Sequence, residues 1–176
     1  KTPLDASRTC FTRTDQGWAE GLHPTDAFLK TTQEVLGPLN LATAYDRLTR
    51  LEFLTPNGSV CRAVYGHGDA ATCVTVNFGA NDAPVDSQLG GKVLLPAWGF
   101  VIDGPRFAAF YAKRWNGRDY ANGALFSLQC LEDKSLRQAT RLRIFHGFGD
   151  PQIAWRGATH EVRREQVVSV SPGGRP

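Results

Sequence analysis

The chain has 176 residues, which suits one domain with a hydrophobic core. Its 41% hydrophobic and 21% charged residues are typical of a globular protein, and its net charge is only +3. The lysines and arginines are scattered, which argues against nucleic-acid binding. No apolar stretch approaches the roughly 20 residues that a membrane-spanning helix needs. We therefore expect neither a nucleic-acid partner nor a membrane span.

Residues 1–54 are expected to form an N-terminal arm followed by a helical segment. Residues 1–22 show no periodicity, which indicates an extended or irregular arm. The chain starts at Lys1, contains no Met and has no apolar leader, so we interpret it as a processed or trimmed piece. Thr25 is a suitable N-cap for a helix that ends at Gly37-Pro38. A second short helix is expected to follow, with Leu41 and Leu48 on one side.

The predicted first helix carries one apolar face, formed by Phe28, Leu29, Val35 and Leu36. Two helices within about 30 residues cannot bury such faces by themselves. The sequence therefore predicts that this segment packs on the rest of the chain or on another polypeptide.

Beyond residue 55 the apolar period changes to two, which is typical of β-strands. Gly, Pro, Asn and Asp punctuate the runs, beginning with Asn57-Gly58. The strands are expected at 59–65, 71–78, 92–95, 100–102, 107–115, 124–129, 141–146 and 161–170. This pattern predicts a mainly β fold, an antiparallel β-sandwich of about eight strands over residues 55–170, preceded by the short helical segment. Residues 171–176 are expected to form a tail.

The stretch "CRAVYGHGDAATC", from Cys61 to Cys73, combines two cysteines with His67 and an aspartate. If two strands pair about a turn centred on His67, Cys61 lies directly opposite Cys73, close enough for a disulfide. A zinc site is disfavoured, because His67 at the tip is about 20 Å from either cysteine. We therefore predict a disulfide between Cys61 and Cys73, with two free thiols as the alternative and no metal ligands.

Cys10 and Cys130 remain for a second bridge, and their pairing stays open. An even number of cysteines is consistent with a secreted or cell-surface protein.

Motifs of catalysis are missing from the sequence. It contains no nucleophile elbow, no phosphate-binding loop and no dinucleotide fingerprint. The aspartates at 82, 86, 103, 119 and 150 stand beside turn residues, and nothing selects two of them as an acid–base pair. We predict no catalytic residue and no cofactor, and leave open whether the chain belongs to an enzyme.

Trp115 and Tyr120 flank the predicted turn "NGRD". Aromatic rings exposed at a turn can stack on sugar faces, so these two are candidate carbohydrate-binding residues.

Five segments together resemble one protein family: "HPTDAFLKTTQEVLGPLN", "EFLTPNGSV", "VTVNFG", "LPAWGFVIDGPRFAAFYA" and "RIFHGFGD". They resemble the C-terminal part of large secreted bacterial glycoside-hydrolase-like proteins, whose catalytic barrel is related to the endo-α-N-acetylgalactosaminidase type. The resemblance implies a last barrel-side helix followed by a β-sandwich. It carries over no catalytic residue, because those belong to barrel strands for which this chain has no room.

The resulting expectation is a non-catalytic C-terminal module of a secreted glycoside-hydrolase-like protein, which packs against a catalytic barrel or a partner chain. The alternatives are a self-assembling extracellular structural protein and a free-standing carbohydrate-binding module.

Overall fold

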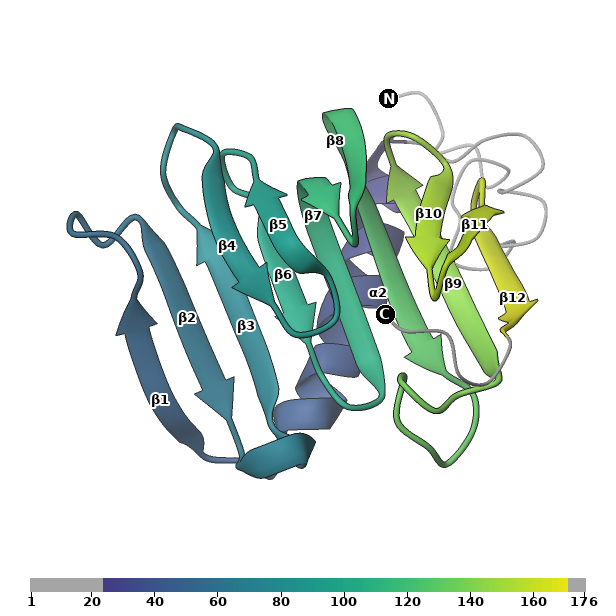
Figure 1. Cartoon of the computed structure of the whole chain (residues 1–176), viewed down its shortest axis with the longest axis horizontal. Helices are drawn as coiled ribbons and strands as arrows, with labels where there is room; N and C mark the ends of the chain where they lie inside the picture. Colours follow the sequence, from purple (N-terminus) through teal and green to yellow (C-terminus); the bar gives the residue numbers. More distant parts are fainter. Residues whose placement is uncertain (1–23, 171–176) are drawn as a thin grey trace, which may run out of the picture.

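The structure, a computed structural model, describes residues 24–170. The fold is mainly β, as predicted: one helix precedes a large antiparallel sheet (Figure 1). The elements are α2 (Pro24–Thr43), β1 (Leu48–Phe53), β2 (Val60–Tyr65), η3 (Gly68–Ala70), β3 (Thr72–Asn77), β4 (Ala83–Ser87), β5 (Gly91–Leu95), β6 (Phe100–Asp103), β7 (Phe107–Trp115), β8 (Arg118–Cys130), β9 (Arg141–Phe148), β10 (Gln152–Trp155), β11 (Ala158–Glu161) and β12 (Glu165–Ser169).

The helix is longer than the sequence predicts, and the expected second helix is wrong. α2 continues through Gly37-Pro38 to Thr43, and after a turn the residues Leu48–Phe53 form strand β1. Pro38 removes one helical hydrogen bond, but Leu39 just beyond it packs against the sheet. Packing therefore overrides the local stop signal. Within residues 24–170, no helix combines the length and the apolar character that crossing a membrane requires.

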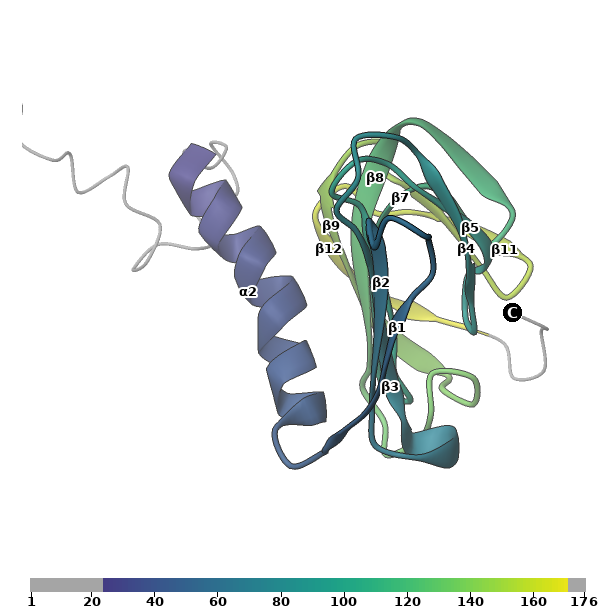
Figure 2. The same cartoon turned by 90° about the vertical axis from the view of Figure 1, so that its left-hand side faces the viewer.

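The large sheet has ten strands, eight of which follow the order β1-β2-β3-β6-β7-β8-β9-β12. The β4–β5 hairpin joins this sheet where Leu94 pairs with Arg114, and β10 and β11 form a separate two-stranded sheet. Figure 2 shows α2 on one side of the large sheet and β4, β5 and β11 on the other. The sheet begins at β1, before the boundary expected near residue 54, because β1 pairs with β2.

Two hydrophobic clusters lie on the two faces of the sheet. The larger is built around Trp115, whose ring stacks on Phe110 with centroids 4.5 Å apart and on Trp155 at 5.8 Å. The smaller lies beneath α2, where Val35 packs with Ile102 and neighbouring side chains. The α2 helix packs on one surface of the sheet, which we call the helix face. We call the opposite surface the pocket face.

Candidate functional site

The hairpin of β2 and β3 does not pair as predicted. Cys61 lies opposite Val76, three residues beyond Cys73, and Cys73 lies opposite Val64. The cause is the 3₁₀ turn Gly68–Ala70, which lengthens the loop on the β3 side of His67. The predicted disulfide is therefore wrong, and both cysteines are free.

The two thiols also lie on opposite faces of the sheet. Cys61 stands in one cross-strand row with Phe53, Val76, Phe100 and Tyr111. Phe100 and Tyr111 pack against the cluster under α2, so this row belongs to the helix face. Because successive residues of a strand point to alternate faces, Cys73 belongs to the pocket face.

A cavity of about 550 Å³ opens on the pocket face, and it gathers part of the predicted ligand cluster. Its lining includes His67 and Cys73 of the hairpin, Arg62 of β2, Ser87 of β4 and Asp103 of β6. No group of three His, Cys, Asp or Glu side chains in residues 24–170 is placed to hold a metal ion.

Asp103 is the buried group of this cavity, with 5% of its surface exposed. Its carboxylate accepts hydrogen bonds from Ser87 Oγ at 2.7 Å, from the Gln88 N–H at 3.1 Å and from the Leu89 N–H at 3.2 Å. Burial raises the pKa of Asp103, and these hydrogen bonds offset only part of the effect. Asp103 therefore ties the β4–β5 connection to β6.

Two further side chains of the cavity, Arg62 and Cys73, are also unavailable for catalysis. Arg62 donates from Nε to Thr75 Oγ1 at 3.0 Å and from Nη2 to the Asp86 carbonyl at 2.7 Å. Burial raises the pKa of the Cys73 thiol, which keeps it protonated and weakly nucleophilic near neutral pH. The cavity thus offers a polar wall and no activated nucleophile.

The remaining turn aspartates are ion-paired rather than directed at one another. Their partners are Lys113 for Asp82, Lys92 for Asp86, Arg114 for Asp119 and Arg118 for Asp150. Asp86 and Asp103 line the same cavity. The sequence did not predict that these two aspartates meet, because the order of the strands in the sheet decides it.

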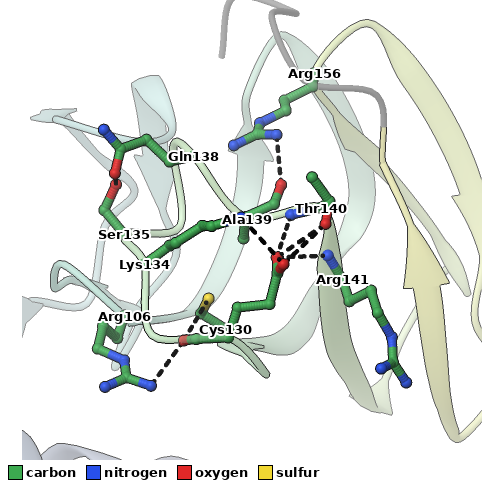
Figure 3. Close-up of polar contacts among 10 residues, drawn as sticks. Arg106, Cys130, Lys134, Ser135, Gln138, Ala139, Thr140, Arg141 and Arg156 are labelled. Carbon is green, nitrogen blue, oxygen red and sulfur yellow. Dashed lines mark hydrogen bonds and ion pairs between the residues drawn. The ribbon is translucent and has the colours of Figure 1, made fainter.

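Cys130 lies at the end of β8, beside a tightly bonded loop (Figure 3). Its Sγ donates to the Glu132 carbonyl at 3.2 Å. The Glu132 carboxylate accepts hydrogen bonds from the N–H and hydroxyl of Thr140 and from the Arg141 N–H, led by the Thr140 N–H, and its pKa falls to about 2. Figure 3 also shows Arg156 reaching the Ala139 carbonyl, at 2.7 Å. Cys10 lies outside the described residues.

The two candidate carbohydrate-binding residues are buried, so that prediction is wrong. Trp115 is 1% and Tyr120 2% exposed. Asn116 and Gly117 adopt left-handed backbone angles, with φ of 47° and 74°, and Trp115 pairs directly with Arg118 across this tight turn. β8 therefore folds back along β7, and both rings enter the larger core.

An exposed aromatic pair does exist elsewhere. Trp98, 69% exposed, meets Phe78 edge to face with ring centroids 6.4 Å apart. Trp98 has a φ of 62°, an unusual angle for a bulky residue, and a Gly99 N–H to Pro96 carbonyl bond of 2.8 Å closes its turn. The signal in the sequence was "PAWG", a turn that contains an aromatic residue.

Among residues 24–170, nothing covers most of the apolar face predicted for the helix. Val35 is buried against the sheet, whereas Phe28 is 68% exposed and Leu29 and Leu36 are also exposed. The side of α2 that meets the sheet is partly polar instead, because Glu34 of this side is buried and bonded to Arg143 of β9. We call Phe28, Leu29 and Leu36 the helix stripe.

The sheet also stays apolar where α2 does not cover it. One row of the helix face runs from Ala109 through Ile102, Val74 and Ala63 to Leu51. Ala109 and Ile102 are buried under α2, Val74 and Ala63 are half-buried, and Leu51 is 54% exposed. The neighbouring row of the helix face, which contains Cys61 and Val76, ends at Phe53, and Phe53 is also exposed. We call the helix face of β1, β2 and β3 the open face.

Comparisons with models of known protein families, with curated proteins and with solved structures find no match for this chain. A function therefore has to rest on its own surfaces and residues.

Proposed function

We propose that this chain is a non-catalytic β-sandwich module of a secreted glycoside-hydrolase-like protein, and that it packs against a catalytic barrel or a partner chain. The observation that carries the proposal is the uncovered apolar surface formed by the helix stripe and the open face. Clusters of exposed apolar side chains on a folded domain mark interaction sites.

The helix supports this proposal because it presents apolar side chains to both sides. Val35 and Leu39 pack with the sheet, while Leu29 and Leu36 point away from it. A helix that is amphipathic towards one sheet only would have polar residues at those outer positions. An outer layer of protein over α2 would bury the helix stripe and so explain why these outer positions are apolar.

The open face supports the proposal in a second way. An antiparallel sheet with one solvated face alternates apolar and polar residues. β1 instead places Leu51 and Phe53 on the open face, next to half-buried Ala63 and Cys61 of β2. A second layer resting on both α2 and these strands would bury this face.

The chemistry of the cavity is consistent with a non-catalytic role. Its carboxyl group holds a chain connection and its thiol is protonated, so neither is set up for acid–base or nucleophilic work. Secretion and the glycoside-hydrolase context rest on the resemblance of the sequence segments alone, since the predicted disulfide does not form.

Hydroxyl-radical footprinting tests the docking surface. We expect Phe28, Leu36 and Phe53 to be oxidised in the isolated chain and protected in the natural polypeptide, where the partner layer covers them. Trp98 serves as the control, because it is about as exposed as Phe28 and Phe53 and belongs to neither the helix stripe nor strands β1, β2 and β3. Equal oxidation of the three residues in both samples would contradict the proposal. Cross-linked peptides from the protected sample would show whether the covering layer is a barrel domain.

A second candidate function is carbohydrate binding at the Trp98–Phe78 pair. A strained turn holds the exposed indole of Trp98 in place, and such a ring can stack on the apolar face of a pyranose. A glycan array probed with the chain and with Trp98→Ala tests it. Binding that disappears in the variant supports this candidate, and a blank array for the unchanged chain contradicts it.

A further inference from the structure

Strand β1 ends the strand order of the large sheet within residues 24–170, so one side of its backbone is unpaired. In an antiparallel ladder the N–H and C=O of one residue point to the same side, and the side alternates along the strand. The Leu54 N–H donates to the Val60 carbonyl on the β2 side, at 2.8 Å. The backbone groups of Phe53 and Leu51 therefore point to the open edge.

This edge lacks two of the usual protections against pairing with another chain, and its two charged residues, Arg50 and Glu52, are paired with each other. Natural sheet edges carry lysine, proline or inward charges, or are covered. β1 reads "LTRLEF", with no lysine and no proline, and its bulge lies at Thr49, outside the regular stretch from Arg50 to Phe53. The opposite edge differs, since Glu165 of β12 is held by Arg143 at 2.7 Å. Among residues 24–170, β1 therefore combines an unpaired backbone side with two exposed apolar side chains, Leu51 and Phe53.

We propose that β1 is a self-association edge, on which a second copy of this chain pairs its own β1 in antiparallel orientation about Leu51. In this register Leu51 faces the partner's Leu51, and the outward backbone groups of the two residues bond to each other. Arg50 faces the partner's Glu52, and Glu52 faces the partner's Arg50, so two opposite-charge pairs flank the centre. This inference is independent of the proposed docking function.

The charge pattern is what selects a second copy over an unrelated strand. Arg50 and Glu52 lie on the pocket face of β1, 3.4 Å apart within one chain, and both project beside the edge. Any register centred on Arg50 would set like charges against each other, which destabilises a cross-strand pair. The register centred on Leu51 sets Arg50 against Glu52 at both charged positions and joins the open faces of both copies.

Sedimentation velocity of the full chain tests the association. A strand of this length buries a small interface, so we expect a reversible dimer with a dissociation constant on the order of 10 μM. A sedimenting mass that stays monomeric up to about 0.5 mM contradicts the proposal.

Charge substitutions test the register. Arg50→Glu alone and Glu52→Arg alone set like charges at both flanking positions, so each should weaken self-association about tenfold or more. An equimolar mixture of the two variants restores opposite charges between the chains, although not within either one. We therefore expect a heterodimer in the mixture, and the double variant Arg50→Glu/Glu52→Arg should dimerise like the unchanged chain.

Two further variants locate the interface. Leu51→Lys places a charged group at the centre of the pair and should abolish the dimer. Val167→Lys introduces the same group at the half-exposed position of β12 and should leave the dimer unchanged. Circular dichroism verifies that each variant is folded. A dimer that withstands Leu51→Lys, or a mixture of the single variants that stays monomeric, overturns the β1 register.

Discussion

Arg143 of β9 and Glu34 of α2 form a two-bond ion pair, with Nη1–Oε2 and Nη2–Oε1 distances of 2.6 and 2.7 Å. This pair ties the helix to the sheet across 109 residues of sequence. Burial by itself raises the pKa of Glu34, but hydrogen bonds from Arg143 and Lys30 outweigh it and leave the pKa below its usual value. The position of α2, and with it the exposure of the helix stripe, therefore depends on a charged contact.

Removing this contact should loosen the helix. Glu34→Ala leaves Arg143 with Glu165 alone in a half-buried site, and we expect a loss of about 2 kcal/mol in the free energy of unfolding. Urea unfolding followed by circular dichroism measures it. The matched control is Glu161→Ala, which removes an exposed pair with Arg163 and should change nothing measurable. Equal losses in the two variants would contradict the role of Glu34.

The same ion pair predicts a dependence of stability on pH. The folded chain lowers the pKa of Glu34, so the stabilisation is present above the unfolded value of 4.5 and is lost as the pH falls through the folded pKa. The contribution of Asp103 to stability depends on pH in the opposite direction. Its pKa is raised in the folded chain, so its stabilisation is present at acid pH and is lost as the pH rises through the folded pKa.

Unfolding midpoints measured from about pH 3 to about pH 7 separate the two groups. Glu34→Gln should reduce the loss of stability on acidification, whereas Asp103→Asn should reduce the loss on raising the pH. Identical pH profiles for the unchanged chain and both variants would rule out these assignments.

One comparison of two tryptophan variants tests the buried position of Trp115 against the exposed position of Trp98. Trp115→Ala removes a fully buried ring that stacks on Phe110 and Trp155, and we expect a loss of about 3–5 kcal/mol or a failure to fold. Trp98→Ala removes an exposed ring of the same size and should cost less than about 1 kcal/mol. Thermal unfolding of both variants measures the difference, and similar losses would contradict the buried position of Trp115.

The cysteines provide a direct chemical test of the hairpin register. Cys61 and Cys73 lie on opposite faces of the sheet, so the chain purified without reductant should contain no bridge between them. Alkylation of the native chain followed by peptide mass mapping should modify Cys73 slowly at neutral pH, because burial raises the pKa of its thiol. A peptide pair joined through Cys61 and Cys73 would contradict the register.

Much of the fold follows from local patterns. The period-two runs predicted strands at the sites of β2, β3, β5, β6, β7, β8, β9 and β12, and β7 runs from Phe107 to Trp115 as expected. The short strands β4, β10 and β11 were not predicted. The helix start was also readable, because Asp26 in the first turn and the apolar spacing after it are local signals. The strand β1 was missed because "LTRLEF" has a period that suits either a helix or a strand, and its pairing with β2 decides between them.

The candidate site was less predictable, since it depends on register and strand order. A turn of three residues placed Cys61 and Cys73 on opposite faces, because a shift by an odd number of residues moves a strand's side chains to the other face. The burial of Trp115 and Tyr120 depends on β8 folding back over the core, which composition does not show.

The sequence by itself determined the class of fold, because hydrophobic periodicity and turn residues act over short distances along the chain. It also determined that α2 carries more apolar surface than a single sheet needs. Only the tertiary structure decided which of that surface is covered, where the thiols and aspartates meet, and which strand ends the sheet. Those properties come from contacts between residues far apart in sequence, such as Glu34 with Arg143 and Cys73 with Asp103, which no local pattern specifies.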